Sequence, residues 1–393
     1  MANTLTNLIP VLYQGLDLVS RELVGFIPAV SLDAKADSAA VGQTITTSIT
    51  PAATIADVVP GQLPPDDGDQ ALATLSMSIT KSKYSPIRWS GEELKGFLNA
   101  GSPESRQAAQ DALAKQFAQS MRAITNAVEL DLAVVGAAGA SRAYGTAATT
   151  PFATAGDMSD LAQTRKILED NGCPMTDCQF VMNTAAGANL RGKQSNLFKV
   201  NEAGTDSILR KGAFFDLEGF QVGMSGQLKQ TTAGAGAVGT VTATAALGAT
   251  SISITTAAAS SLTVLAGDVL VLAGDTNKYV VAAAATIGAS TTGTVTIQAP
   301  GLLKAASAAA TTVGATFTPN VAFCRDAMKL LARSPAMPDG GDDADDVTYI
   351  TDPTSGLTFQ VAVYRLYRRV KYEVGLAWGV KNIKPEWTAL LLG

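Results

Sequence analysis

The clearest pattern in the chain is SPESRQAAQDALAKQFAQSMRAITNAVELDLAVV, residues 102–135. Apolar residues recur in it every three or four positions, which places them on one face of a helix about 50 Å long. Ser102 and Pro103 suit the first positions of such a helix, and Gly136 and Gly139 suit its end. The residues predicted to be buried are Leu113, Phe117, Met121, Ile124, Val128, Leu132 and Val135.

Two further patterned segments lie on the N-terminal side of this helix. Residues 5–24 carry one apolar stripe that predicts a short helix, which is too small to be a domain and needs a partner surface. Residues 41–80 predict a long hairpin whose strands alternate apolar residues with Thr or Ser, joined by a proline-rich connection. An isolated hairpin is only marginally stable in water. We therefore expect contacts with a neighbouring subunit through Ile45, Ile49, Leu75, Met77 and Ile79.

The C-terminal side begins with a predicted helix over 159–171 and a strand over 178–183. The composition then changes at about residue 231, because residues 231–320 contain only four charged side chains. Short alternating segments separated by Gly, Ser, Asn and Asp predict a small all-β module over 231–317, a barrel or a sandwich. Disorder is the alternative, but low-complexity sequence would not keep such regular alternation.

Charged and aromatic residues return after position 320. Residues 321–334 predict a helix or a helix-to-strand switch, and periodicity does not decide between them. An acidic loop follows at 339–346, and strands are predicted at 357–364 and 366–375. The blocks 96–230 and 321–393 therefore form one predicted α+β unit, with the β module inserted between them.

A dense basic cluster lies near the C-terminus, and Tyr364, Tyr367 and Tyr372 are interleaved with it. It could bind nucleic acid through phosphates and base stacking. On a strand, however, alternate residues face opposite sides, so no single face collects all of its charges. Ion pairing between subunits, with the acidic loop as one partner, is the better interpretation. The residues concerned are Arg365, Arg368, Arg369 and Lys371, with Asp342, Asp343, Asp345 and Asp346.

Composition excludes several function classes. The net charge of −5 argues against a protein that condenses nucleic acid. The absence of histidine removes His-based triads and His-ligated zinc or haem, and the acidic loop lacks the spacing of an EF-hand. The three cysteines, Cys173, Cys178 and Cys324, fit buried free thiols and a reducing compartment. We predict no catalytic residue, metal or cofactor.

Three other patterns receive plain interpretations. GAGAVG at 234–239 matches the dinucleotide fingerprint but lacks its strand-to-helix context, so it predicts a linker. The long uncharged runs are too rich in Thr, Ser and Gly to span a membrane. No secretory signal precedes the first basic residue, Arg21, which argues against a cell-surface β-rich structural protein.

The order of elements resembles the major capsid protein of tailed double-stranded-DNA bacteriophages, the Hong Kong 97 capsid fold. The resemblance rests on the hairpin ending in KSKYSPIRWSGEEL, the helix at 102–135, FVMNTAAGANLRG at 180–192, NVAFCRDAMKLLARSPAMP at 320–338 and LAWGVKNIKPEW at 376–387. The pattern "leucine, x, glycine, phenylalanine … valine … serine" of the family is matched by Leu217, Gly219, Phe220, Val222 and Ser225. The β module is similar to the inserted domain of a subgroup of short-tailed-phage coat proteins.

The resemblance implies five parts: an N-terminal arm at 1–40, an extended loop at 41–95, a peripheral domain at 96–175 with the spine helix, an axial domain at 176–230 and 318–393, and the inserted domain at 231–317. It also implies self-assembly into hexamers and pentamers of an icosahedral head that encloses double-stranded DNA, followed by procapsid maturation. We expect deletion of 1–40 to leave a folded subunit that cannot form closed shells.

The implied partners are other copies of the chain, a separate scaffolding protein and a portal, with a decoration protein and non-specifically contacted DNA as further ones. The implied location is the virion, after assembly in the host cytoplasm. The alternative is a subunit of a protein-shelled encapsulating compartment, whose subunits are shorter and usually lack such an insertion.

Overall fold

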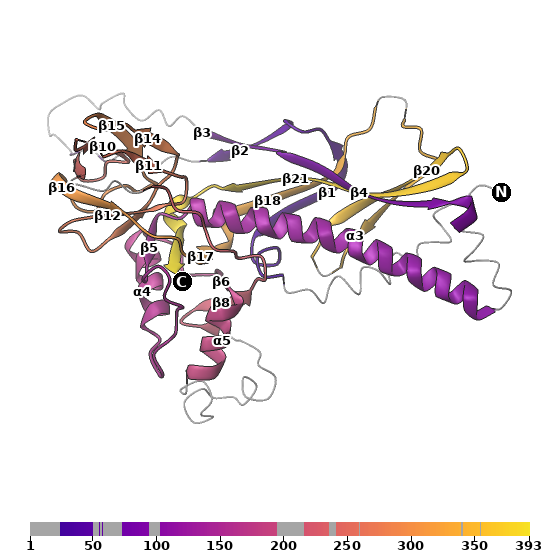
Figure 1. Ribbon diagram of the computed structural model, residues 1–393, viewed down its shortest axis with the longest axis horizontal. Helices are drawn as coiled ribbons and strands as arrows, with labels where there is room; N and C mark the ends of the chain where they lie inside the picture. The colour runs from indigo at the N-terminus through magenta and orange to yellow at the C-terminus, as the bar shows by residue number, and fades with distance from the viewer. Residues whose placement is uncertain are drawn as a thin grey trace.

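The computed structural model describes residues 24–49, 55, 57, 73–93, 103–194, 216–235, 241–258, 260–338, 341–353 and 355–393. The helix predicted at 5–24 lies outside these residues, except for its last position, and so does the cap residue Ser102. The described part has a mixed α+β fold, in which one long helix crosses a sheet and a second sheet extends from its end (Figure 1).

The long helix is α3, Pro103–Ala138, and its 36 residues span about 54 Å at 1.5 Å per residue. The predicted stripe is confirmed, although its two outermost members, Leu113 and Val135, are only half-buried. The prediction that Gly136 ends the helix is wrong. Gly136 lies inside α3 at a close approach, where a Cβ atom would meet the Met328 side chain at 3.3 Å. The helix ends before Gly139, whose carbonyl accepts a hydrogen bond from Asn382 Nδ2 at 2.9 Å.

The first large sheet lies along α3 and is centred on the longest strand, β21 (Arg369–Asn382). One side of β21 pairs with β4 (Lys81–Ser90). The other side of β21 pairs with two strands in succession along its length. Residues 369–375 pair with β20 (Thr358–Leu366), and residues 377–382 pair with β18 (Met328–Pro335). Two outer strands complete the sheet: β1 (Ser31–Ala39), parallel to β18, and β19 (Asp346–Thr351), antiparallel to β20. The two strands predicted at 357–375 are confirmed, and the second continues seven residues further.

The helical interpretation of 321–334 is wrong. This segment forms the end of β17 (Pro319–Cys324), a short 3-10 turn at Arg325–Ala327, and most of β18. All six residues of β17 are buried, because the strand lies inside a sheet that is covered on both faces. A strand buried on both faces shows no alternation of apolar and polar residues, which explains the ambiguity of the sequence pattern.

The second large sheet has twelve strands, and half of them come from each of two regions of the chain. The first half surrounds β17 and carries α4 (Ser159–Asp170) and α5 (Thr184–Lys193). Its other strands are β5 (Arg142–Tyr144), β22 (Thr388–Leu392), β6 (Cys178–Met182), β8 (Phe220–Met224) and β7 (Asp216–Leu217). Helix α5 follows β6 directly, and Asn183 Oδ1 accepts the amide of Ala186 at 2.7 Å at the start of this helix.

The second half of that sheet is the insert, residues 231–317. Its large-sheet strands are β9 (Val241–Ala245), β10 (Ser251–Thr256), β12 (Val269–Leu272), β13 (Lys278–Val280), β15 (Thr292–Thr296) and β16 (Ala306–Val313). A separate small sheet pairs β11 (Leu262–Val264) with β14 (Ala285–Ile287). Val281 bridges to Ile297, and the amide of Ala282 donates to Thr296 at 2.8 Å. These bonds join the two ends of the six-strand series, as the predicted barrel requires.

The insert has its own apolar core but is not detached from the remainder of the chain, which we call the body. Its buried residues include Ile252, Ile254 and Val295, all fully buried. Strand β13 nevertheless pairs with β5 of the body, and Gln298 Nε2 donates to the carbonyl of Ala138 at 2.8 Å. The sheet of the insert and the sheet of the body are therefore one hydrogen-bonded unit (Figure 1).

Candidate subunit-contact surfaces

The described chain begins at a buried anchor on α3. The amides of Gly25, Phe26 and Ile27 donate to the carboxylate of Glu129 at 2.7, 2.8 and 3.1 Å. Glu129 is fully buried, and its pKa is raised because burial, the largest influence, outweighs the hydrogen bonds that favour the charged form. This carboxylate therefore fixes the backbone of residues 25–27 against α3.

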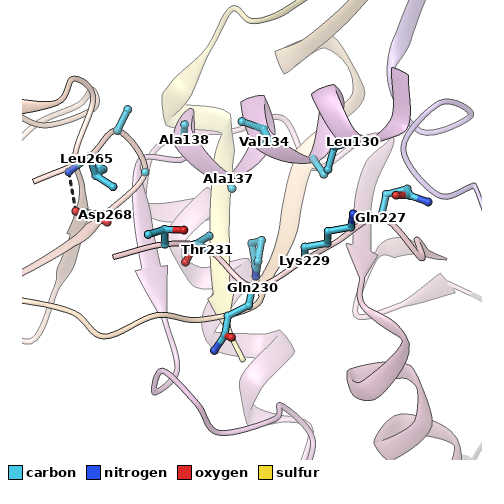
Figure 2. A pocket seen from close by; sticks show the side chains of 15 residues that line it. Leu130, Val134, Ala137, Ala138, Gln227, Lys229, Gln230, Thr231, Leu265 and Asp268 are labelled. Atoms are coloured by element: carbon cyan, nitrogen blue, oxygen red, sulfur yellow. Dashed lines mark hydrogen bonds between the residues drawn. The ribbon is translucent and has the colours of Figure 1, made fainter. Parts of the chain in front are cut away.

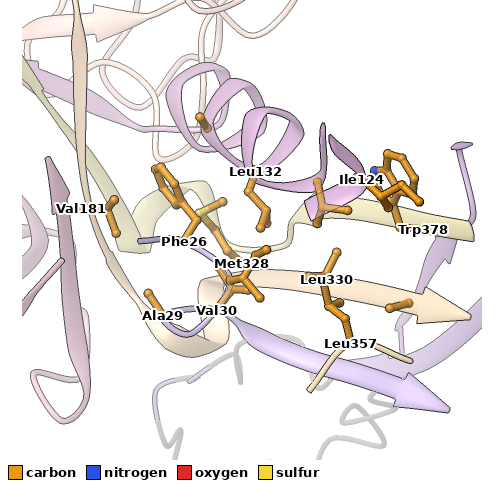
Figure 3. Close-up of a cluster of buried hydrophobic side chains, with 14 of the residues drawn as sticks. Phe26, Ala29, Val30, Ile124, Leu132, Val181, Met328, Leu330, Leu357 and Trp378 are labelled. Carbon is orange, nitrogen blue, oxygen red and sulfur yellow. The ribbon is translucent and has the colours of Figure 1, made fainter. Parts of the chain in front are cut away.

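The residues that follow this anchor belong to the core. Phe26 stacks on Phe323 with ring centroids 6.0 Å apart, and Ala29 and Val30 pack beside Met328 and Leu330 (Figure 3). Strand β1 continues the attachment, since Arg333 donates to the carbonyl of Asp33 at 2.6 Å and to its carboxylate at 3.2 Å. Residues 25–39 of the predicted arm are thus packed against the body and paired with it.

The hairpin predicted at 41–80 is confirmed as strands β2 (Thr44–Ile49) and β3 (Ala73–Ser78), with Ile45 opposite Met77. Two of its five predicted contact residues are not available to a neighbour. Met77 and Ile79 are buried against Ala39, Leu331 and Ala377 of the same chain. Ile45 and Leu75 are half-buried, and the side chain of Ile49 lies outside the described part.

The base of the hairpin is tied to the long helix by Asp131. Lys81 Nζ lies 2.6 Å from Asp131 Oδ1, and Trp378 Nε1 donates to Asp131 Oδ2 at 2.8 Å. The two bonds join α3, β4 and β21 at one side chain. The hairpin is consequently held at its base, while the exposed residues of β2 and β3, such as Thr44, Thr46 and Thr74, face solvent.

The predicted basic cluster forms the tip of the β20–β21 hairpin, at the end of the molecule opposite the insert (Figure 1). Arg368 occupies the turn with a φ of 55°, and its guanidinium lies over the ring of Tyr367. Arg369 is exposed beside it. Tyr367 is 86% exposed and Leu366 is 53% exposed, so the tip combines positive charge with apolar surface. Such mixed, protruding surface is typical of protein contacts.

The acidic loop pairs with this hairpin inside the same chain. Arg365 Nε lies 2.6 Å from Asp345 Oδ2, and Tyr364 donates to Asp342 Oδ2 at 2.5 Å. The second bond lowers the pKa of Asp342, and burial together with that bond raises the pKa of Tyr364. Asp343 is exposed, and Asp339 lies outside the described residues. The predicted pairing thus exists for Arg365 and Asp345, but within one subunit.

Lys371 is also satisfied locally. Its Nζ atom lies 2.6 Å from Glu373 Oε2, 4.9 Å from the ring centroid of Tyr84 and 5.4 Å from that of Tyr364. The strand register places Arg369 and Lys371 on one face of the sheet and Arg365 on the other, so no single face carries all of these charges, as predicted. Arg368 and Arg369 remain at the exposed tip, and Arg365 and Lys371 are held by acids of their own chain.

A cavity of about 250 Å³ lies where the insert meets α3 (Figure 2). Leu130, Val134 and Ala137 line one wall, and the connecting residues 227–232 line another. Asp268 closes it from the insert side, where its buried carboxylate accepts the amides of Leu265 at 2.7 Å and Gly234 at 3.0 Å. The GAGAVG segment thus begins with Gly234 bound to Asp268, in the connection between the body and the insert. Residues 236–239 of that segment lie outside the described residues.

Sequence reasoning missed the anchor formed by Glu129. A signal was present, because Glu129 lies directly beside Val128 at the edge of the predicted apolar stripe, where a charge requires a partner. The described residues contain no cluster of three or more Cys, Asp or Glu side chains suited to a metal ion. Within the same ranges, no helix combines the length and the apolar character needed to cross a membrane.

Comparison with known proteins places the fold. No family model matches the sequence, and no curated protein matches it. Among solved structures, "Capsid structure of the Cyanophage P-SCSP1u" has a TM-score of 0.50 and 11% identity, and the match covers 95% of this chain and 88% of that chain.

Two other solved structures cover most of the chain with lower TM-scores. "Mycobacterium phage Che8" has a TM-score of 0.46 and 13% identity over 89% of this chain and 84% of that one. "Crystal structure of virus-like particle from Pyrococcus furiosus" has a TM-score of 0.42 and 9% identity over 98% and 100%. The match to the cyanophage structure shows that the two chains share a fold, which in this chain is the predicted α+β fold.

Proposed function

We propose that the chain is a structural major capsid protein that assembles into hexamers and pentamers of an icosahedral phage head enclosing double-stranded DNA. The observation that carries the proposal is the fold shared with the cyanophage capsid structure over 95% of this chain and 88% of the other. A likeness along nearly the whole of both chains favours a shared architecture over a shared single domain.

In this proposal each part of the chain has a role in the shell. Residues 1–40 are the N-terminal arm, residues 41–95 are the extended loop, and α3 is the spine of a peripheral domain at 96–175. Residues 176–230 and 318–393 form the axial domain, from which the insert projects. The anchor at Glu129 supports this division, because it fixes residues 25–27 of the arm to the spine helix.

The exposed tip formed by Arg368 and Arg369 is our candidate for contact with the next subunit. It protrudes at the far end of the body, and its neighbour Tyr367 supplies apolar surface. Asp343 in the acidic loop and Ile45 and Leu75 in the hairpin are further candidates, with Ile49. A stable obligate interface buries on the order of 2,000–5,000 Å², so these contacts would act together.

The proposal assigns no catalytic residue and no cofactor to the chain. It locates the protein in the virion, after assembly in the host cytoplasm. A separate scaffolding protein and a portal are the proposed assembly partners. A decoration protein would bind outside, and the DNA inside would be contacted without sequence preference. The sequence charge of −5 suits such a container, since a strongly basic inner wall would hold the packaged genome in place.

Electron microscopy of the purified chain, alone and co-expressed with its neighbouring genes, tests the function. We expect closed particles tens of nanometres across. Monomers or small oligomers under all of these conditions would overturn the proposal. Shells that form but never retain DNA would favour an encapsulating compartment.

The contact residues need a test of their own. We expect the double substitution Arg368→Ala and Arg369→Ala to reduce the yield of shells while thermal unfolding of the subunit stays unchanged. Arg365→Ala is the matched control, because that arginine lies on the same hairpin but is paired with Asp345. Equal loss of shells in the control, or loss of DNA retention without loss of shells, would contradict the assigned role.

A further inference from the structure

All three cysteines of the chain meet in one buried cluster. Cys173 follows α4, Cys178 begins β6 and Cys324 ends β17, and they are 7%, 1% and 4% exposed. The sulfur atoms of Cys173 and Cys178 both lie near the carbonyl of Pro174, at 3.6 and 3.7 Å. Three separate segments therefore bring every thiol of the protein to one place in the body.

Two of these thiols occupy directly opposite positions on paired strands. Cys178 faces Cys324 in the antiparallel register of β6 and β17. The hydrogen bond beside them joins the flanking residues, since the amide of Arg325 donates to the carbonyl of Asp177 at 3.2 Å. That arrangement is a non-hydrogen-bonded pair, in which the Cα atoms are about 4.5 Å apart and the side chains are closest. Disulfides span Cα separations of about 4.4–6.8 Å.

We propose that Cys178 and Cys324 form a disulfide bond when the protein meets a peroxide. The Cys178 thiolate attacks one oxygen of hydrogen peroxide, the O–O bond breaks, and the products are a sulfenic acid and hydroxide. The Cys324 thiolate then attacks the sulfur of Cys178, the S–S bond forms, and the S–O bond breaks. The two hydroxides that leave take up the two thiol protons, so two thiols and one peroxide give one disulfide and two waters.

The surroundings assign the first step to Cys178. A hydrogen bond from Cys173, together with the positive charge of Arg165, lowers the pKa of Cys178, whereas burial raises the pKa of Cys324. Peroxide is small enough to reach a thiol that is nearly buried. Cys173 stays reduced beside the bond, because its hydrogen bond to Cys178 and its burial raise the pKa of its own thiol and keep it protonated.

The bond would close a large loop. The residues between Cys178 and Cys324 include α5, β8 and the whole insert. A cross-link at this point constrains the unfolded chain strongly, because the stabilisation by a disulfide grows with the length of the loop. The inference does not depend on shell assembly and applies to the single subunit.

The experiment uses the full-length chain, purified in reductant, transferred to reductant-free buffer and treated with equimolar hydrogen peroxide. We expect the number of thiols titrated after denaturation to fall from three to one, and a non-reduced digest to contain the peptide linked through Cys178 and Cys324. The midpoint of thermal unfolding should rise by roughly 3–6 °C.

Variants distinguish this bond from other oxidation. Cys173→Ser is the matched control and should still form the bond, with its titrated thiols falling from two to none. Cys178→Ser should keep both remaining thiols, whereas Cys324→Ser should lose the Cys178 thiol as a sulfenic acid and form no linked peptide. In the wild type, three retained thiols, a linked peptide that contains Cys173, a bond between two chains, or thiol loss without any linked peptide would each overturn the proposal. The mapping on the wild type decides even where a variant does not fold.

Discussion

The body and the insert share one hydrogen-bonded sheet but are stabilised in different ways. The body joins segments far apart in sequence, such as β1 and β18, whose residues Asp33 and Arg333 are 300 positions apart. Buried charged groups secure it at single points. The insert pairs strands that are close in sequence, with Thr244 and Ala308 only 64 positions apart, around an apolar core. Both regions have an apolar core, so removing one polar anchor should weaken contacts between distant segments of the body, whereas removing one apolar side chain of the insert should act locally.

The largest effect is expected from Glu129→Ala. The substitution leaves three buried amides without their acceptor, which should lower the free energy of unfolding by about 3–5 kcal/mol. Urea unfolding followed by tryptophan fluorescence measures it, since Trp89, Trp378 and Trp387 all lie in the body. Lys115→Ala, on the exposed face of the same helix, is the control. A loss below 1 kcal/mol would show that the anchor is dispensable.

The next largest effect is expected in the insert, from Ile254→Ala. Removing three carbons from its fully buried core should destabilise the insert by about 2–4 kcal/mol. Because the insert contains no tryptophan, far-ultraviolet circular dichroism should change while the tryptophan transition stays where it is. Leu247→Ala, at a residue 69% exposed, is the control. If both signals shift equally, the shared sheet makes the two regions one cooperative unit.

A smaller effect is expected from Asp131→Asn. The change removes the ion pair with Lys81 but leaves an oxygen that can accept from Trp378, so the loss should be about 1–2 kcal/mol. Hydrogen exchange should report the loss at the base of the β2–β3 hairpin and leave the insert unchanged. Faster exchange throughout the insert would contradict the separation of the two regions.

A change of pH should affect the stability of the body through Glu129. The pKa of Glu129 is raised in the folded protein above the value of 4.5 for a free side chain, so the folded state binds more protons. Its contribution is fully present below the unfolded pKa and is lost as pH rises through the folded pKa. The effect should be modest, because burial and the three hydrogen bonds oppose one another. The stability difference between wild type and Glu129→Gln, measured in urea at several pH values, should shrink as pH rises; a constant difference would contradict the assignment.

The smallest effect is expected from Arg365→Ala. Its ion pair with Asp345 is largely exposed, and such pairs contribute about 0–1 kcal/mol. The unfolding midpoint should scarcely move, and salt should remove what difference exists. A loss above 2 kcal/mol would mean that polar anchoring in the body extends to its surface.

The sequence predicted those elements that are specified by a pattern within a short stretch of the chain. The stripe of α3, the alternation of β2 and β3 and the strands of the insert all follow from a repeat that a short window contains. Of the candidate contact residues, sequence correctly separated the faces of the basic cluster, because alternation along a strand is also local.

The remaining features depend on contacts between distant segments. Glu129 finds its partners more than 100 positions away. Phe26 and Ile27 join the core without any periodic pattern, and Met77 and Ile79 are covered by strands near the C-terminus. Helix α5 was missed because TAAGANLRGK has small residues and little amphipathic character. Only the assembled structure shows which surfaces remain for a neighbour.

The pairing of β1 with β18 has a consequence for protein synthesis. Ribosomes add roughly 5–20 residues per second, so the partner of β1 is made roughly 15–60 s after β1 itself. Strand β4 waits similarly for β21, which is almost the last segment to be translated. During that interval the nascent chain exposes unpaired strand edges. We therefore expect the supply of holdase chaperones at the ribosome to determine the yield of soluble subunit more than the stability of the finished fold does.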